Sequence, residues 1–275
     1  MPAILIIIPT YQEAGAFLRA LKRGLESPQT QTPFATSITP ISPSFKHELR
    51  RAAKYATLPL LDSQGVALSP LVFEIRGARI TVVIPGMGAL LPLLYLQQHF
   101  SHEELKQFHL VCLSGVCAIT TGNSASSSQL IGKTVSSTSF TFLSPNFIED
   151  DTFAQQLHHR CYSTVDFKTK HKELLAPEKI VKYCLSTPWS LKNDHRMDQH
   201  ISSTIDCPAI IEMEAYSLAL MAEQQKIPFA ILKIVSDSLD TPGDSQKIAA
   251  RMPELSQTCC KALCLCINRF SIATD

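Results

Sequence analysis

The sequence predicts an α/β protein with a mostly parallel central sheet and helices on both faces. Three largely apolar runs predict buried strands, at Ile4–Ile8, Phe108–Leu113 and Phe229–Val235, of which the last is interrupted only by Lys233. Strands covered by helices on both faces have such runs, because neither face of the sheet meets water. Helix-like segments separate the runs, which is the alternation typical of α/β folds.

Composition restricts the class of protein further. The chain has 275 residues, of which 45% are hydrophobic, so we expect a single domain over 1–275 with a large core. The 25 basic and 24 acidic residues give a net charge of +1 without a basic block, which argues against a nucleic-acid partner. No apolar run reaches membrane-spanning length, and the apolar start lacks a basic flank, so a cytoplasmic protein is expected.

Nine cysteines occur, mostly inside apolar segments, where free thiols pack as small hydrophobic groups. Four of them, at 259, 260, 264 and 266, fall in a helical pattern without CxxC spacing. The histidines also show no metal-ligand spacing. We therefore expect no metal site and no cofactor, and a reducing compartment.

The first strand leads into a candidate catalytic residue. Pro9 ends the strand, and Glu13 follows at the start of a predicted helix. Thr10 and Glu13 have the spacing of a helix capping box, which is the structural interpretation. The alternative is that Glu13 is a catalytic base just beyond the strand. A loop-rich insertion is predicted at 27–69, with a short helix over Lys46–Tyr55.

The middle of the chain contains two glycine-containing turns. Leu71–Ile75 and Arg79–Ile84 predict a hairpin, and Gly86-Met87-Gly88 then separates strand from helix. Two glycines there permit close backbone approach to a ligand, although no dinucleotide or P-loop motif is complete. After the strand at Phe108–Leu113, the small residues of 114–118 predict a turn that contains Gly115, Val116 and Cys117-Ala118.

Further strand patterns cover Leu130–Thr141 and Cys161–Phe167, with a short helix expected over Asp151–His159. Ile210–Asp240 is the most informative stretch. Ile211, Ala215, Leu218 and Ala222 have helical spacing, so a helix is predicted from about Ile211. The last strand then ends at Ser236-Asp237, and one or two terminal helices cover Gln246–Phe270 with a break near Pro253.

Polar and glycine residues thus follow the carboxyl ends of several predicted strands, namely Glu13, Gly86, Gly115 and Asp237. In a parallel sheet those ends share one edge, where ligands of α/β proteins bind. The sequence therefore predicts one cleft formed by residues more than two hundred positions apart.

Two motifs carry a resemblance to a known family. Glu212-Met213-Glu214-Ala215 gives an EMEA motif, and Ser236-Asp237 follows after a helix and a strand. This combination resembles the methylthioadenosine/S-adenosylhomocysteine nucleosidases of the nucleoside phosphorylase superfamily. The resemblance implies the three-layer nucleoside phosphorylase-like fold, a homodimer, and hydrolysis of an adenine nucleoside by water.

The resemblance also implies roles for individual residues. Asp237 would protonate N7 of the purine, and Glu13 would activate the attacking water. Glu214 would bind the ribose hydroxyls and Met213 would pack on the sugar, while Phe167 would stack on the base. The remaining expected substrate contacts are Gly86, Gly115, Val116, Ser236 and Lys233.

The chain departs from the family pattern at two places. Lys233 stands where arginine is usual, and Cys117-Ala118 replaces part of a glycine-rich stretch. The candidate substrates are 5′-methylthioadenosine, S-adenosylhomocysteine and 6-amino-6-deoxyfutalosine, because an aspartate at Asp237 suits a 6-amino purine. A purine nucleoside phosphorylase and a non-catalytic nucleoside-binding protein stay open as alternatives. Both carboxylates also have a purely structural interpretation. Glu214 would be an ordinary acidic residue in the first turn of a helix, and Asp237 would cap a turn.

Overall fold

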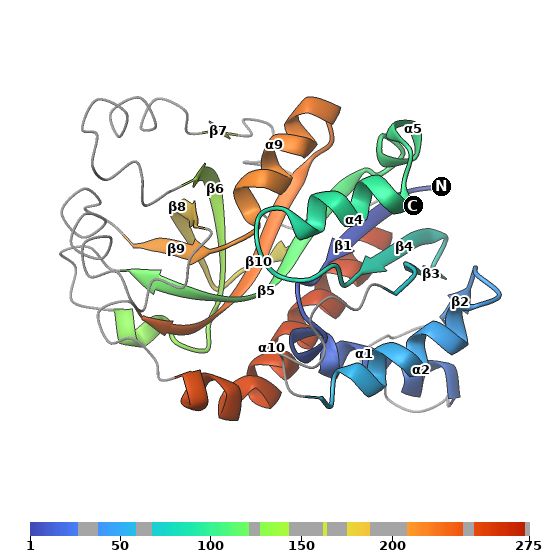
Figure 1. Cartoon of the computed structure of the whole chain (residues 1–275), viewed down its shortest axis with the longest axis horizontal. Coiled ribbons are helices and arrows are strands. Elements are labelled where there is room, and N and C mark those ends of the chain that lie inside the picture. Colours follow the sequence, from blue (N-terminus) through green and yellow to red (C-terminus); the bar gives the residue numbers. More distant parts are fainter. Residues whose placement is uncertain are drawn as a thin grey trace.

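A mixed β-sheet runs through the protein, with helices on both sides (Figure 1). The computed structural model describes residues 1–26, 38–58, 68–120, 127–142, 162–163, 175–187, 208–238 and 245–272. Within these ranges the strands are β1 Ala3–Ile7, β2 Thr39–Pro40, β3 Leu71–Ile75, β4 Ala78–Val83, β5 Leu110–Thr120, β6 Thr134–Phe142, β7 Tyr162–Ser163, β8 Lys179–Ser186, β9 Ala209–Glu212 and β10 Phe229–Ser238. The helices are α1 Tyr11–Glu26, α2 Phe45–Tyr55, α4 Leu91–His99, α5 His102–Leu105, α9 Ala215–Gln225 and α10 Ser245–Ile272, with a 3-10 turn at Ser127–Leu130.

The core of the sheet is parallel. Strand β1 lies between β4 and β5 and is parallel to both, and β5 is also parallel to β10. The three apolar runs predict β1, β5 and β10, and β4 is the second strand of the predicted hairpin. Their carboxyl ends therefore lie along one edge of the sheet, as the sequence analysis expects.

The sheet is mixed rather than purely parallel, with most of its paired residues in parallel pairings as expected. The pairs β3–β4, β2–β3, β5–β9, β6–β7 and β6–β10 are antiparallel. Because β10 pairs with both β5 and β6, the strands β5, β9, β8, β6 and β10 close into a ring. The α/β class and the layered arrangement are confirmed.

Helices cover both faces of the sheet. One buried cluster joins Ile4, Ile6 and Ile8 to apolar residues of α1, α2 and α10. A second cluster joins Leu5 and Ile7 to residues of α4 and α9. Successive residues of β1 therefore face opposite layers, which explains why its apolar run has no polar alternation. In Figure 1, α4 and α9 lie on one side of the central strands, and α1, α2 and α10 lie on the other.

Several local predictions are confirmed. Strands β3 and β4 form the expected hairpin, whose turn places Arg76 and Gly77 at φ +49° and +74°. The short helix predicted at Lys46–Tyr55 is α2, and it packs into the core through Phe45 and Leu49. The seven cysteines within the described residues are free and buried.

Three local predictions are wrong. The small residues 114–118 do not form a turn, because β5 continues through them to Thr120. Ile211 lies in strand β9, and α9 begins only at Ala215. Pro253 does not break the terminal helix, since α10 is continuous from Ser245 to Ile272.

Part of the predicted insertion at 27–69 is described: residues 38–58 contain β2 and α2. The helix predicted at Asp151–His159 lies outside the described residues. Among the helices that the structure describes, none is long and apolar enough to cross a bilayer.

Candidate active site

Glu13 lies in the first turn of α1, directly beyond the carboxyl end of β1. Its Oε2 accepts hydrogen bonds from the backbone nitrogen and the hydroxyl of Thr10, at 2.9 and 2.8 Å. The Thr10 hydroxyl oxygen in turn accepts the backbone N–H of Glu13 at 3.2 Å, which completes the predicted capping box. The cap uses mainly one carboxylate oxygen, so it does not exclude a second role for Glu13.

The second carboxylate oxygen of Glu13 reaches strand β5. Its Oε1 accepts the backbone N–H of Val116 at 2.7 Å, across 103 residues of sequence. Gly115 makes this approach possible, because a Cβ at that position would lie 2.6 Å from the same oxygen. The φ of Gly115 is +143°, a backbone conformation that side-chain-bearing residues rarely adopt. The structure thus brings Glu13, Gly115 and Val116 together.

Glu214 is held from two sides at the start of α9. Its Oε1 accepts the backbone N–H of Gly88 at 2.9 Å, and its Oε2 lies 3.4 Å from Nζ of Lys233. Gly88 follows β4 in the glycine turn that the sequence singles out, and both Gly86 and Gly88 have positive φ. Gly86 itself donates to the carbonyl oxygen of Pro9 at 3.0 Å, which ties the turn to the end of β1.

Lys233 is a fully buried cation on strand β10. Besides Glu214, its Nζ contacts Oε2 of Glu212 at 3.6 Å. Lys233 is paired in register with Gly115 of the neighbouring strand β5, next to the residue that holds Glu13. The expectation that Lys233 is a substrate contact is untested, but its buried ammonium is already engaged by two carboxylates.

Burial and neighbouring charges shift the pKa values of Glu13, Glu212 and Lys233. Burial raises the pKa of Glu13, although the Lys233 ammonium opposes the rise. Burial likewise raises the pKa of Glu212, again opposed by Lys233. Burial disfavours the charged form of Lys233, but Glu214 and Glu212 outweigh it and raise the pKa of Lys233 above its ordinary value. Lys233 therefore stays protonated, while Glu13 and Glu212 bind protons more readily than exposed glutamates do.

Asp237 lies four residues after Lys233 on the same strand. The hydroxyl of Ser236 is 2.5 Å from its Oδ1 and 3.0 Å from the carbonyl oxygen of Cys117. The pairing of β10 with β5 shifts by one residue between Val235 and Asp237, which is a β-bulge. Bulges re-aim side chains at the ends of strands, and here the bulge leaves Asp237 only partly buried.

Two further residues, Met213 and Phe167, are predicted to contact the substrate. Met213 lies half-buried between the two glutamates of its motif. Phe167 lies outside the described residues, so its stacking role is untested. Within the described ranges, no three His, Cys, Asp or Glu side chains are arranged to hold a metal ion.

Sequence analysis missed several members of the site. Glu212 and Ser186 were given no role, although the hydroxyl of Ser186 donates to Oε1 of Glu212. The EMEA motif is the signal for Glu212, whereas no local signal marks Ser186 at the end of strand β8. Gly88 was noted only as part of a turn, and its N–H is the one that binds Glu214.

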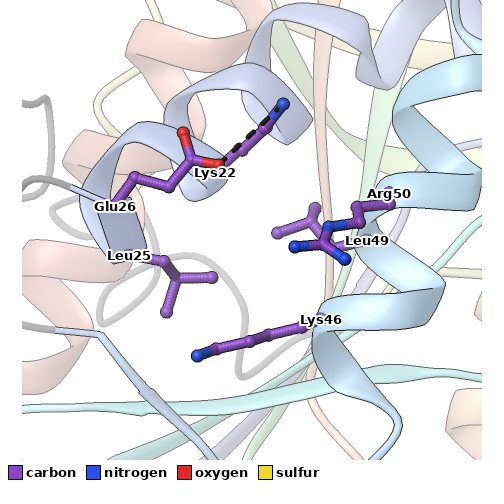
Figure 2. Close-up of a pocket in the computed structure, with 6 residues that line it drawn as sticks. All are labelled: Lys22, Leu25, Glu26, Lys46, Leu49 and Arg50. Atoms are coloured by element: carbon purple, nitrogen blue, oxygen red, sulfur yellow. Dashed lines mark ion pairs between the residues drawn. The ribbon is translucent and has the colours of Figure 1, made fainter.

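A separate hollow of about 110 Å³ lies between α1 and α2, away from this group of residues (Figure 2). Nucleoside-sized ligands need roughly 300 Å³ or more, so this hollow is too small to hold one. Lys22 on its rim lies nine residues after Glu13, about 13 Å farther along the helix axis. Its lining consists of Lys22, Leu25, Glu26, Lys46, Leu49 and Arg50.

Comparison with known proteins agrees with this architecture. Residues 189–268 match the sequence pattern of the phosphorylase superfamily. Sequence comparison with characterised proteins gives no match.

Solved structures with the same fold include nucleosidases. The apo 5′-methylthioadenosine nucleosidase of Arabidopsis thaliana has a TM-score of 0.62 and 17% identity, over 98% of this chain and 96% of that one. A futalosine hydrolase mutant of Helicobacter pylori has a TM-score of 0.63 and 14% identity, over 98% and 100%. The Campylobacter jejuni 5′-methylthioadenosine/S-adenosylhomocysteine nucleosidase has a TM-score of 0.61 and 13% identity, over 98% of each chain. The resemblance drawn from the EMEA and Ser-Asp motifs is thus confirmed at the level of the fold.

Proposed function

We propose that this protein is a purine nucleosidase that hydrolyses the N-glycosidic bond of an adenine nucleoside and releases adenine. The observation that carries the proposal is the placement of Glu13. Its carboxylate is buried at the end of β1, bound to β5 through Val116, and close enough to Lys233 for that cation to affect its pKa. This arrangement lies at the sheet edge where α/β proteins bind ligands.

Glu13 is the proposed general base. A carboxylate oxygen has two lone-pair sites, and the described donor to Oε1 is the single N–H of Val116. Oε1 can therefore accept a proton from a water molecule without losing that bond. A raised pKa makes the carboxylate a stronger base than an exposed glutamate.

Asp237 is the proposed general acid. A purine anion leaves poorly, so the base must be protonated at N7 as the bond to the sugar breaks. The hydroxyl of Ser236 holds one carboxylate oxygen of Asp237, which leaves the other for the base. We expect the protonated carboxyl to give its proton from that oxygen to N7 and to become a carboxylate, which accepts a hydrogen bond from the 6-amino group and so selects adenine over a 6-oxo purine.

Glu214 is the proposed ribose ligand. Its carboxylate would accept hydrogen bonds from the 2′ and 3′ hydroxyls, and its charge would favour the cationic sugar of the transition state. Met213 would pack on the sugar, and Phe167, Gly86, Gly115 and Val116 would line the pocket. These contacts, like the catalytic roles, are proposals.

The test is adenine release, followed by chromatography, from 5′-methylthioadenosine, S-adenosylhomocysteine and 6-amino-6-deoxyfutalosine side by side. Known structures of this fold include nucleosidases for substrates of the first two kinds and a futalosine hydrolase, so one of the three should turn over. Asp237→Asn should lower kcat by about 10²–10⁴-fold while binding stays measurable. Wild-type rates in this variant would contradict the acid assignment.

A phosphorylase is the second candidate, because the matched sequence pattern belongs to the phosphorylase superfamily. The carboxylate of Glu13 argues against it, since it would repel a phosphate ion at the position of the attacking water. Rates measured with and without phosphate distinguish the two reactions. Binding of adenosine analogues without release of adenine would instead indicate a non-catalytic nucleoside-binding protein.

A homodimer and a cytoplasmic location also belong to this proposal. Helix α4 and the residue before it carry Leu90, Leu91 and Leu94, which are 63%, 44% and 42% exposed. Burying such a cluster against a second copy would be favourable. Sedimentation of the purified protein measures the oligomeric state directly.

A further inference from the structure

Glu212 is a buried carboxylate to which the proposed mechanism assigns no role. It ends strand β9, two residues before Glu214, and its side chain is 1% exposed. A buried carboxylate destabilises a protein unless it is paired and hydrogen-bonded. The partners of Glu212 therefore indicate what it does.

Glu212 binds the backbone from which Glu214 projects. Its Oε2 accepts the backbone N–H groups of Glu214 and Ala215, both at 2.8 Å. Helix α9 begins here, and its N-cap residue Glu214 makes no capping bond with its own side chain. Glu212 thus satisfies the first N–H groups of α9 and leaves the side chain of Glu214 available for other contacts.

Glu212 also shares a cation with Glu214. Nζ of Lys233 lies 3.6 Å from Oε2 of Glu212 and 3.4 Å from Oε2 of Glu214. An ammonium between two carboxylates has its position fixed by both of them. Removing the charge of one carboxylate would let the ammonium move toward the other, and Glu214 would lose the alignment that the pair maintains.

Ser186 holds Glu212 from the opposite side. Its hydroxyl donates to Oε1 of Glu212 and accepts the backbone N–H of Tyr216 in α9 at 2.8 Å. Both carboxylate oxygens of Glu212 are therefore bound. The Glu212 side chain thus connects the ends of β8 and β9 to the start of α9.

We propose that Glu212 is a positioning residue that holds the Glu214 carboxylate in place for the ribose hydroxyls, with Ser186 and Lys233 fixing its two sides. This inference rests on the proposed function, because it takes Glu214 as the ribose ligand. The inference makes a specific prediction: substitution of Glu212 should lower kcat/KM only for substrates that carry the hydroxyls that Glu214 binds. A 2′,3′-dideoxy substrate, which lacks both hydroxyls, should be insensitive to it.

The experiment compares 5′-methylthioadenosine with its 2′,3′-dideoxy analogue in the wild type and in Glu212→Gln. Glutamine keeps an oxygen for the two N–H groups of α9, and its amide can donate to Ser186, so the fold is retained. We expect kcat/KM for the ribonucleoside to fall about tenfold, mainly through KM, which corresponds to weakening one hydrogen bond to a charged group. The value for the 2′,3′-dideoxy analogue should change by less than about twofold, because it lacks both hydroxyls.

Glu48→Gln is the matched control, since Glu48 is another carboxylate with little exposure, ion-paired to Arg51 on α2, and it is not in this site. This substitution should leave kcat/KM unchanged for both substrates. Ser186→Ala removes the support of Glu212 together with the acceptor of the Tyr216 N–H. It should shift the preference for the ribonucleoside over the dideoxy analogue in the same direction, which decides the matter if Glu212→Gln fails to fold.

Equal losses on both substrates, or no loss on either, would overturn the positioning role while leaving the nucleosidase proposal in place. Absence of adenine release by the wild-type protein would overturn the proposed function itself, and the positioning role with it.

Discussion

Replacing Gly115 by alanine tests how Glu13 is brought to its position. Gly115 has a φ of +143°, and a Cβ there would lie 2.6 Å from Glu13 Oε1 and 3.2 Å from Cδ of Pro9. An ordinary contact starts near 3.4 Å, so the glutamate must move by 0.8 Å (3.4 minus 2.6). That movement weakens the bond between Glu13 and the N–H of Val116.

The cost has two parts. Backbone strain at such a φ costs about 1–3 kcal/mol for a residue with a side chain. Leaving the N–H of Val116 without its charged acceptor costs about 1–3 kcal/mol more. The free energy of unfolding should therefore fall by about 2–6 kcal/mol, which lowers the thermal midpoint by at least roughly 4 °C in a chain of this size. Adenine release should fall as well, since the proposed base is displaced.

Gly77→Ala is the control for this substitution. Gly77 also has a positive φ, +74°, but a Cβ there would meet nothing within 4 Å. It should cost about 1 kcal/mol through strain alone and leave the rate of adenine release unchanged. The reasoning is refuted if Gly115→Ala matches Gly77→Ala in thermal midpoint and retains the wild-type rate.

Two further predictions concern the charges around Glu13. Burial raises the pKa of Glu13, and a general base must be unprotonated to act. The acidic limb of the pH profile of kcat/KM should therefore lie above 4.5, the ordinary pKa of glutamate. An acidic limb at or below 4.5 would contradict the assignment of Glu13 as the base. Lys233→Met should move that limb to higher pH, because Lys233 lowers the pKa of Glu13. The same variant leaves Glu212 and Glu214 buried without their cation, so chemical denaturation should show a loss of about 3–5 kcal/mol, whereas an unchanged stability would mean that the ion pairs are not formed.

Sequence patterns predicted the strands that are buried on both faces. Ile4–Ile8 and Phe229–Val235 are apolar without interruption except at Lys233, and burial from both layers leaves no place for polar alternation. The hairpin turn at Arg76-Gly77 was also predicted from the sequence, because its backbone conformation is a local property.

Two strands of the ring were not predicted, for different reasons. Strand β8, Lys179–Ser186, has two lysines, one of which interrupts its apolar residues, so it lacks a continuous apolar run. Strand β9 has four residues, and the spacing of Ile211 with Ala215, Leu218 and Ala222 favoured a helix instead. Closure of the ring converts both into strands, because β5 and β8 supply hydrogen-bond partners from distant parts of the chain.

The sequence by itself determined the α/β class, the parallel core of the sheet, and the residue types at the ends of its strands. These depend on local periodicity, on turns, and on where apolar runs stop. Only the tertiary structure decided that β5 passes straight through Gly115, that Lys233 lies between Glu212 and Glu214, and that Ser186 holds Glu212. The physical reason is that a buried charge is defined by its partners, and these partners are brought together by strand pairing between segments far apart in sequence.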